Sequence, residues 1–229
     1  MTKIEFKQLN HKVKFRERKF KFTENQVNFL KTALDPKTKL LFLSGPAGTA
    51  KTYMATYSAL QIMVDSGMEK GILYIRSIAE SAQRSMGSLP GDLNEKFSVF
   101  ATPFYDKLDE IINTSDIKIL REKGLFDCIP VNYIRGSNWN DSVVIIDEAQ
   151  NFSYNELLTT LTRIGEDSKI IICGDPMQSD INNSGFSKIF DIFNDRESQD
   201  NGVMCKEFTA DDIKRSEIVK FIVSKLEKN

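Results

Sequence analysis

Residues 40–52 constrain the fold more than any other stretch, because a strand-length apolar run leads directly into a glycine-containing turn. The stretch reads LLFLSGPAGTAKT. Its apolar half predicts a buried strand at 39–44, and its glycines let the backbone turn sharply around an anion. The residues that follow would open a helix whose free N–H groups and positive dipole end face that anion. The stretch therefore predicts a phosphate-binding loop between a strand and a helix at 51–66.

The loop follows the pattern G-x-x-x-x-G-K-S/T, except that alanine stands at position 50. A Cβ at that position is expected to strain a tight turn of the backbone. Lys51 is expected to reach the terminal phosphates of a nucleotide, and the Thr52 hydroxyl to bind the accompanying Mg²⁺. For the loop alone, the alternative is a glycine-rich turn before an ordinary helix. The predicted nucleotide-binding residues of the loop are Gly45, Pro46, Ala47, Gly48, Thr49, Ala50, Lys51 and Thr52.

The composition excludes several classes of protein. The 229 residues suffice for one good-sized domain or two small ones, with apolar and charged fractions typical of soluble globular proteins. Three widely spaced cysteines and a single histidine argue against a structural zinc site and against a disulfide scaffold. The apolar runs are strand-length at most, so we expect no signal peptide, no membrane contact and a cytoplasmic location.

The first 22 residues are strongly basic. They carry eight lysines and arginines against two glutamates, a local balance of +6 in a chain whose net charge is −1. Such an arm could hold nucleic acid phosphates. Its apolar residues also alternate with polar ones, which equally predicts edge strands whose lysines protect a solvated face. We therefore treat residues 1–22 as a basic N-terminal arm or edge strands, separate from a domain at 23–229.

The rest of the chain alternates apolar strands with helices. Thr23 is expected to cap a first helix that stops before Pro36. Strands that are apolar throughout predict a parallel sheet with helices on both faces, and so an α/β fold of three layers. The expected helices lie at 24–34, 51–66, 91–113, 153–164, about 185–194 and from 211, and the strands at 39–44, 71–75, 143–146, 169–173 and about 203–208.

Polar residues follow several of these strands where each strand ends. In a parallel sheet, ligands bind beyond the carboxyl ends of the strands, so these residues should gather at one edge. Asp147 follows four β-branched residues and is expected to hold the nucleotide's Mg²⁺. Glu148 is then placed to act as general base toward the attacking water. The alternative is a pair of surface acids that begin a loop.

Two glutamines are candidate nucleotide sensors. Gln178 lies just past strand 169–173, where its amide could donate a hydrogen bond to the γ-phosphate and lose it on hydrolysis. Without the surrounding motifs, its segment would be an ordinary turn. Gln26 lies on the helix before the first strand and could pair with the N6/N7 edge of adenine, favouring ATP. The residues alone favour a solvent-facing helical glutamine at that position.

Taken together, these motifs resemble those of the PhoH-like ATPases, which are related to the first RecA-type half of superfamily-one helicases. The resemblance runs from about residue 23 to the C-terminus, leaves the arm outside, and has its motifs in order. Besides the phosphate loop, it is carried by 76–106 with its LPGDL core, Arg135-Gly136, DEAQN at 147–151, LTRIG at 161–165, GDxxQxD at 174–180, Ser184-Gly185 and 212–215. The departures from the family pattern are Ala50, Ser77, Gln83, Ser88 and Ser137.

The resemblance implies a RecA-like P-loop NTPase fold with a mainly parallel sheet, and Mg²⁺-dependent ATP hydrolysis. It assigns catalytic roles to Lys51, Glu148 and Gln178. A helicase closes its ATP site with an arginine from a second RecA-type half, and such an arginine can contribute about 10³–10⁵ in rate. We therefore expect a homo-oligomer, with a hexameric ring as one form, whose arginines act in trans. The candidate arginines are Arg135, Arg163 and Arg215, each of which could instead make a local salt bridge.

Two classes of function remain open from the sequence. The first is an ATPase coupled to single-stranded RNA or DNA, with the arm and Arg76 near the strand. The second is a nucleotide-dependent switch or assembly factor with weak or no turnover, in which Ala50 marks a relaxed demand on phosphate handling. The compact chain also resembles the versions of the family carried by bacteriophages, which would act in the host cytoplasm.

Overall fold

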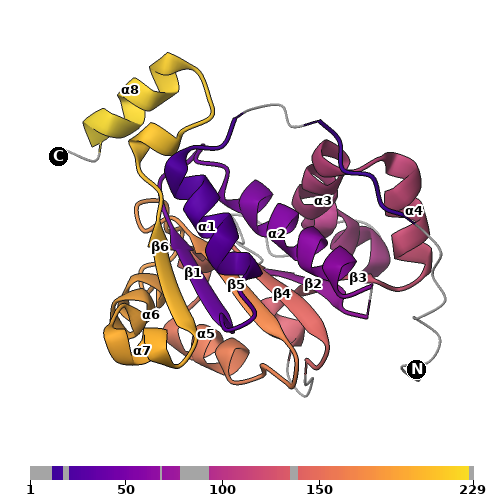
Figure 1. Cartoon of the computed structure of the whole chain (residues 1–229). Coiled ribbons are helices and arrows are strands. Elements are labelled where there is room, and N and C mark those ends of the chain that lie inside the picture. The colour runs from indigo at the N-terminus through magenta and orange to yellow at the C-terminus, as the bar shows by residue number, and fades with distance from the viewer. Residues whose placement is uncertain (1–11, 18–20, 68, 78–92, 135–138, 227–229) are drawn as a thin grey trace.

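A six-stranded parallel sheet organises the molecule, with helices on both of its faces (Figure 1). The computed structural model describes residues 12–17, 21–67, 69–77, 93–134 and 139–226. Its strands are β1 (Leu40–Ser44), β2 (Gly71–Arg76), β3 (Phe126–Pro130), β4 (Ser142–Asp147), β5 (Lys169–Gly174) and β6 (Val203–Glu207). Its α-helices are α1 (Glu24–Leu34), α2 (Lys51–Asp65), α3 (Leu93–Ile111), α4 (Thr114–Glu122), α5 (Tyr154–Leu161), α6 (Phe186–Phe193), α7 (Arg196–Asp200) and α8 (Glu217–Leu226), and short 3₁₀ turns are η3 (Val131–Tyr133), η4 (Ala149–Asn151) and η5 (Ala210–Asp212).

The strand order brings the predicted motifs together. The order is β3-β2-β4-β5-β1-β6, and every pair of neighbours in this sheet is parallel. Because β5 lies between β1 and β4, the phosphate loop after β1 is one strand away from the acidic pair that ends β4. The register aligns Ser44 with Gly174 and Arg76 with Asp147. The predicted three-layer α/β fold and its parallel sheet are confirmed.

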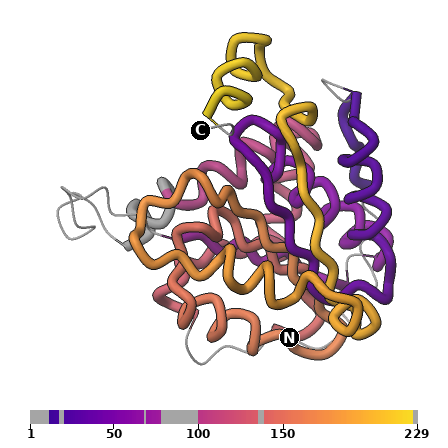
Figure 2. Tube along the Cα trace, turned by 90° about the vertical axis from the view of Figure 1, so that its left-hand side faces the viewer, coloured from indigo at the N-terminus to yellow at the C-terminus, as the bar shows by residue number. Residues whose placement is uncertain are grey.

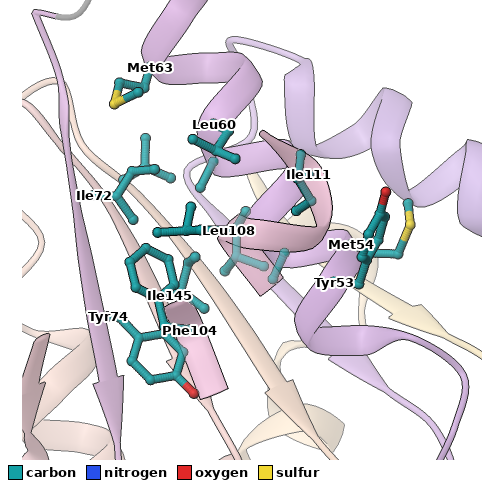
Figure 3. Packing of buried hydrophobic residues seen from close by; sticks show 14 of the residues in the cluster. Tyr53, Met54, Leu60, Met63, Ile72, Tyr74, Phe104, Leu108, Ile111 and Ile145 are labelled. Carbon is teal, nitrogen blue, oxygen red and sulfur yellow. The ribbon is translucent and has the colours of Figure 1, made fainter. Parts of the chain in front are cut away.

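Each face of the sheet buries its own apolar core, because successive strand residues point to opposite sides. In β1, Leu41 and Leu43 pack under α1, α2 and α3, whereas Phe42 packs with α5 and α6 on the other face. Figure 3 shows the first core, where the Phe104 ring from α3 lies beside the ring of Tyr74 from β2. These two rings are stacked, with centroids 5.1 Å apart. Both helical layers are thus held to the sheet by fully buried side chains.

The first helix forms for the reasons that the sequence indicates. The Thr23 side chain accepts from the backbone N–H of Gln26, whose own side chain accepts from the Thr23 N–H, a complete capping box. At the other end, the buried ammonium of Lys169 donates to the carbonyls of Ala33 and Asp35. Burial lowers the pKa of Lys169 to about 8, although Asp35 opposes the shift.

This depressed pKa gives a testable pH dependence. Unfolded Lys169 keeps its proton up to its ordinary pKa of about 10.4, whereas the folded protein loses it near pH 8. The unfolded state then binds more protons between these values, so the free energy of unfolding should rise there. We expect a rise of about 1 kcal/mol, allowing for solvent screening, that Lys169→Met lacks. Urea unfolding at pH 8 and pH 10 measures it, with the exposed Lys37→Met as control; equal pH dependence in all three proteins would contradict this assignment.

The segment between β2 and β4 differs most from the sequence prediction. One helix was expected at 91–113, and α3 fills most of that range. The helix α4 and the edge strand β3 that follow were not predicted. The sequence of β3, FDCIP, places an aspartate and a proline in a five-residue strand, which hides its apolar pattern. Most of the LPGDL core, residues 89–92, lies outside the described residues.

The described part of the basic arm lies against the α3–α4 region. Phe15 forms an isolated antiparallel bridge with Ile112, and its ring packs edge-on to Tyr57. Arg16 donates its backbone N–H to the Ile111 carbonyl at 2.7 Å. The side chains of Lys12, Lys14 and Arg16 are exposed. Within residues 12–17, Phe15 therefore packs against the body while the basic side chains are exposed, and both the edge strands and a nucleic acid contact stay predictions.

The last helix begins later than expected. The chain makes the short turn η5 at Ala210–Asp212 and α8 starts at Glu217, rather than one helix running on from 211. Both backbone views show α8 standing away from the sheet and its covering helices (Figures 1 and 2). Its exposed apolar side chains are those of Ile218, Phe221, Ile222 and Leu226. Among the residues that the structure describes, no helix is both long and apolar enough to cross a membrane.

Candidate functional site

The carboxyl ends of β1, β4 and β5 open into one cavity of about 520 Å³. Most of the predicted site residues lie in its wall, so the expectation that they gather at one edge of the sheet is met. Side chains from α3 and from the segment after β6 complete the wall. The contribution of α3 was not predicted from the sequence. The lining residues are Ala47, Gly48, Ala50, Lys51, Thr52, Tyr53, Lys107, Glu110, Asp147, Glu148, Asp175, Gln178, Lys214 and Arg215.

The phosphate loop holds the left-handed backbone that the pattern demands. Ala50 has φ 66° and ψ 30°, a conformation that favours glycine, and it immediately precedes the first residue of α2. Gly48 is also left-handed, at φ 83°, and a Cβ there would lie 3.3 Å from Arg215. The strain expected from the sequence at position 50 is therefore present in the backbone.

Replacing this alanine with glycine should relieve the strain. Ala50→Gly is expected to raise the free energy of unfolding by about 1 kcal/mol, since a left-handed alanine costs about that much. Nucleotide affinity should be at least as high as in the wild type. Urea unfolding and titration with a fluorescent ATP analogue measure the two effects. If glycine at this position abolishes nucleotide binding, the assumed loop geometry is wrong.

Lys51 points back along the loop. Its ammonium donates to the carbonyls of Gly45 at 2.7 Å and Pro46 at 3.0 Å, and lies 4.0 Å from the Asp175 carboxylate. Asp175 is 3% exposed. Burial raises the pKa of Asp175, and the neighbouring Lys51 charge opposes that shift. The lysine is thus a positive charge held at the mouth of the loop, where phosphates would lie.

Thr52 and Asp147 form the oxygen cluster that a magnesium ion would need. The Thr52 hydroxyl donates to the Asp147 carboxylate at 3.0 and 3.1 Å, and the buried Tyr74 hydroxyl donates to it at 2.7 Å. Burial, and next the charge of Glu148, raise the pKa of Asp147. A hydroxyl and a carboxylate are hard oxygen donors, so these residues fit Mg²⁺. Tyr74 was missed, although a tyrosine inside an apolar strand signals a buried hydroxyl in need of a partner.

Glu148 is held in a strained and specific position. Its backbone is left-handed, at φ 53°. Its carboxylate accepts from the Gln150 amide at 2.6 Å and lies 3.7 Å from the Arg76 guanidinium. Strained backbone of this kind costs about 1–3 kcal/mol and concentrates at functional sites. The role of Glu148 as general base stays a prediction.

The segment after β4 is bonded to the segment after β5. The Gln150 side chain accepts from the Asp175 N–H at 3.0 Å and donates to the Gln178 carbonyl at 3.3 Å. Asn151 and Asp180 exchange two hydrogen bonds, at 2.9 and 2.8 Å. Gln178 thereby sits beside the acidic pair, and a movement of either segment must involve the other. The sequence predicts Gln150 and Asn151 only as part of the DEAQN motif. Their burial just beyond the end of β4 is what indicates that they join the two segments.

Gln26 is a buried residue that joins three segments of the chain. Its side chain is fully buried, so a solvent-facing helical glutamine is wrong. Its amide donates to the carbonyls of Thr49 at 3.1 Å and Asp212 at 3.2 Å, and accepts from Thr23. The amide therefore ties α1 to the phosphate loop and to η5. It is absent from the described cavity wall, and its pairing with adenine stays a prediction.

The three candidate arginines have different places. Arg215 lines the cavity beside Gly48, whose carbonyl accepts the Lys214 N–H at 2.9 Å. Arg163 follows α5 at the opposite edge of the sheet, where its carbonyl accepts from Trp139. A contact of Arg163 with a nucleotide stays a prediction. Arg135 lies outside the described residues.

Together, the parallel sheet, the phosphate loop and the Thr52–Asp147 pair define a P-loop NTPase. Residues 20–227 match the family model described as PhoH-like protein, which covers most of the chain. The chain therefore belongs to the PhoH family. This confirms the family resemblance drawn from the motifs, and with it the RecA-like P-loop fold.

Relatives bearing the family name cover most of the chain. A PhoH-like protein of Synechocystis is 36% identical over 84% of this chain, and one of Mycobacterium tuberculosis H37Rv is 33% identical over 88%. These matches cover 58% and 56% of the two relatives, so the chain spans little more than half of their length. Among solved structures, Pif1 helicase from Candida albicans is similar over 83% of this chain and 40% of that protein, with 17% identity and a TM-score of 0.39.

Proposed function

We propose that this protein is a Mg²⁺-dependent ATPase, that single-stranded RNA or DNA controls its turnover, and that it works as a homo-oligomer. One observation carries the ATPase proposal. The loop lysine, the Thr52–Asp147 oxygen cluster, Glu148 and Gln178 border a single cavity at the carboxyl edge of the sheet. Each is the side-chain type that phosphoryl transfer requires at that place.

The phosphate loop and the oxygen cluster would bind the nucleotide. The N–H groups at the start of α2 face the loop, and Lys51 supplies the positive charge for the terminal phosphates. Thr52 and Asp147 would hold Mg²⁺, which when bound supplies neutralising charge for the phosphates. Tyr74 keeps the Asp147 carboxylate oriented from below, as outer partners of metal ligands commonly do.

Glu148 and Gln178 would serve the chemical step and its readout. The Glu148 carboxylate borders the cavity and is oriented by Gln150 and Arg76, which suits it to take a proton from the attacking water. Gln178 borders the same cavity and is bonded to Gln150 through its own carbonyl. If Gln178 lost its contact with the γ-phosphate and moved, the Gln150 amide, which bonds both the Gln178 carbonyl and the Glu148 carboxylate, would transmit that movement to the acidic pair.

The oligomer is proposed because the chain needs a further cation for fast turnover. Arg215 lines the cavity of its own chain, whereas Arg163 is not among the lining residues and follows α5, near the amino ends of the strands. We propose that neighbouring subunits, in a ring such as a hexamer, supply Arg163 in trans while Arg215 acts within the chain. A wild-type rate in a verified monomer would contradict this part of the proposal.

The deciding experiment measures ATP hydrolysis with and without Mg²⁺, and with single-stranded RNA, single-stranded DNA or duplex. Strong stimulation by a single strand, lost in Glu148→Gln, supports the coupled ATPase. Tight nucleotide binding with negligible hydrolysis, unchanged by nucleic acid, would instead assign the protein as a nucleotide-dependent switch. The strained Ala50 in the phosphate loop is the observation that favours this second function.

A further inference from the structure

The segment between β6 and α8 lies directly against the phosphate loop. Near its start, a Cβ on Gly45 would lie only 2.9 Å from the Cβ of Phe208. Further along, the Lys214 N–H donates to the Gly48 carbonyl at 2.9 Å, and the side chain of Arg215 lies against Gly48. Two glycines of the loop are therefore in close contact with this segment, so the positions of the loop and the segment depend on each other.

Asp212 anchors this segment to the start of α1, beside which it runs (Figure 1). Its buried carboxylate accepts from the Thr23 hydroxyl, from the Asn25 amide at 3.0 Å and from the Thr209 N–H at 2.8 Å. Its backbone carbonyl accepts from the Gln26 amide at 3.2 Å. A buried carboxylate needs such donors to offset its lost hydration, and together they hold it in one orientation.

The anchor fixes the backbone from which Arg215 leaves. The Gln26 amide that bonds the Asp212 carbonyl also donates to the Thr49 carbonyl of the phosphate loop at 3.1 Å. Only two residues separate Asp212 from Arg215, and the first of them, Ile213, is buried. The direction in which Arg215 leaves the backbone is therefore set by the contacts of Asp212.

The direction of Arg215 matters because of where its charge lies. This arginine borders the ATP cavity. In the part of the chain that the structure describes, no carboxylate forms an ion pair with it. A guanidinium binds phosphate oxygens through a rigid, planar set of N–H groups, so its contacts depend on the angle of approach. An arginine at a phosphate-binding cavity thus needs a support that orients it.

We propose that Asp212 is this support: a positioning residue that holds Arg215 where the guanidinium meets the phosphates of ATP. This inference rests on the proposed function and deepens it, because it names what places the arginine that acts within the chain. Asp212 is not among the residues that border the cavity, whereas Arg215 is. The carboxylate therefore acts through the arginine and does not touch the nucleotide.

The test is a double-mutant cycle on kcat/KM for ATP hydrolysis, with the full chain and Mg²⁺. Arg215→Ala should lower kcat/KM by about 10-fold to 100-fold, the range for a lost hydrogen bond to a charged group. Asp212→Asn should lower it by about 5-fold to 100-fold, because a misplaced group loses most of its effect. In the Arg215→Ala background, Asp212→Asn should change kcat/KM by less than about twofold. A merely structural role would cause the same loss in both backgrounds.

Asn25→Asp disturbs the same carboxylate from the surface and keeps the test valid if Asp212→Asn does not fold. It replaces a donor 3.0 Å from the Asp212 carboxylate with a second negative charge. The loss of kcat/KM should recur, and it should again disappear in the Arg215→Ala background. Asn28→Asp adds the same charge at another exposed position of α1 and is the matched control, with kcat/KM like the wild type.

Three results would overturn the role of Asp212 and leave the proposed function standing. They are equal losses in both backgrounds, a wild-type kcat/KM in both Asp212→Asn and Asn25→Asp, and a wild-type kcat/KM in Arg215→Ala. If the wild type hydrolyses no ATP, with or without nucleic acid, the proposed ATPase fails, and this inference with it.

Discussion

Replacing Glu148 with glutamine is expected to lower kcat for ATP hydrolysis by about 10²–10⁴-fold, the contribution of a positioned general base. Glutamine has the same shape and its oxygen can still accept from Gln150, so the side chain should keep its place. It cannot take a proton from water. Nucleotide affinity should therefore stay within about threefold of the wild type, because no phosphate contact is lost. Single-turnover hydrolysis and titration with a fluorescent ATP analogue measure these two quantities.

Glu110 offers a matched control for this substitution. It borders the same cavity from α3 and pairs with Lys107 at 2.6 Å, but it has no link to the Thr52–Asp147 cluster among the described contacts. Glu110→Gln removes the same charge from the cavity wall and should change kcat by no more than about twofold, as expected for a partly exposed ion pair. Similar losses in both variants would mean that Glu148 acts only through the charge of the cavity. A wild-type rate of hydrolysis in Glu148→Gln would show that Glu148 is not the general base.

The placement of the main site residues was predictable because a parallel sheet sets it. The carboxyl ends of parallel strands share one edge, so the loop after β1 and the acids after β4 had to meet once the strands were recognised. Position 50 was predictable in the same way. The lysine of the motif opens the helix, and the residue before it must turn left-handed whether it is glycine or alanine.

The contacts between distant segments were not predictable from the pattern. The sequence around Gln26 gives no sign that this glutamine is buried. Its hydrogen-bond partners, the carbonyls of Thr49 and Asp212, lie far from it along the chain. Tyr74 meets Asp147 only because β2 pairs with β4 in a register set by the whole sheet. The edge strand β3 escaped notice because its residues suit a loop as well as a strand. In each case the deciding interaction is a tertiary contact, which the local preference of the residues for helix or strand does not predict.

Replacing Lys51 with alanine is expected to reduce ATP affinity by roughly 30-fold or more and to leave hydrolysis undetectable. Truncating one partner of a buried charge contact costs about 2–5 kcal/mol, and each 1.4 kcal/mol is tenfold. The loss should also reach Asp175. Without the Lys51 charge, which is the largest influence opposing the burial that raises the pKa of this carboxyl, only the backbone N–H groups of Met177 and Ala47 still oppose it, so the pKa of Asp175 should rise further. Isothermal titration with a non-hydrolysable ATP analogue measures the affinity, and proton uptake on binding reports the change at Asp175.

Lys107→Ala is the matched control, since this lysine borders the same cavity but is paired with Glu110. If position rather than net charge matters, Lys107→Ala should bind ATP within about threefold of the wild type. Equal losses of ATP affinity in the two variants would mean that the cavity attracts phosphates only by its overall charge, and that the position of Lys51 in the loop does not matter. Normal binding by Lys51→Ala would overturn the role assigned to Lys51, because the N–H groups at the start of α2 would then hold the phosphates without a lysine.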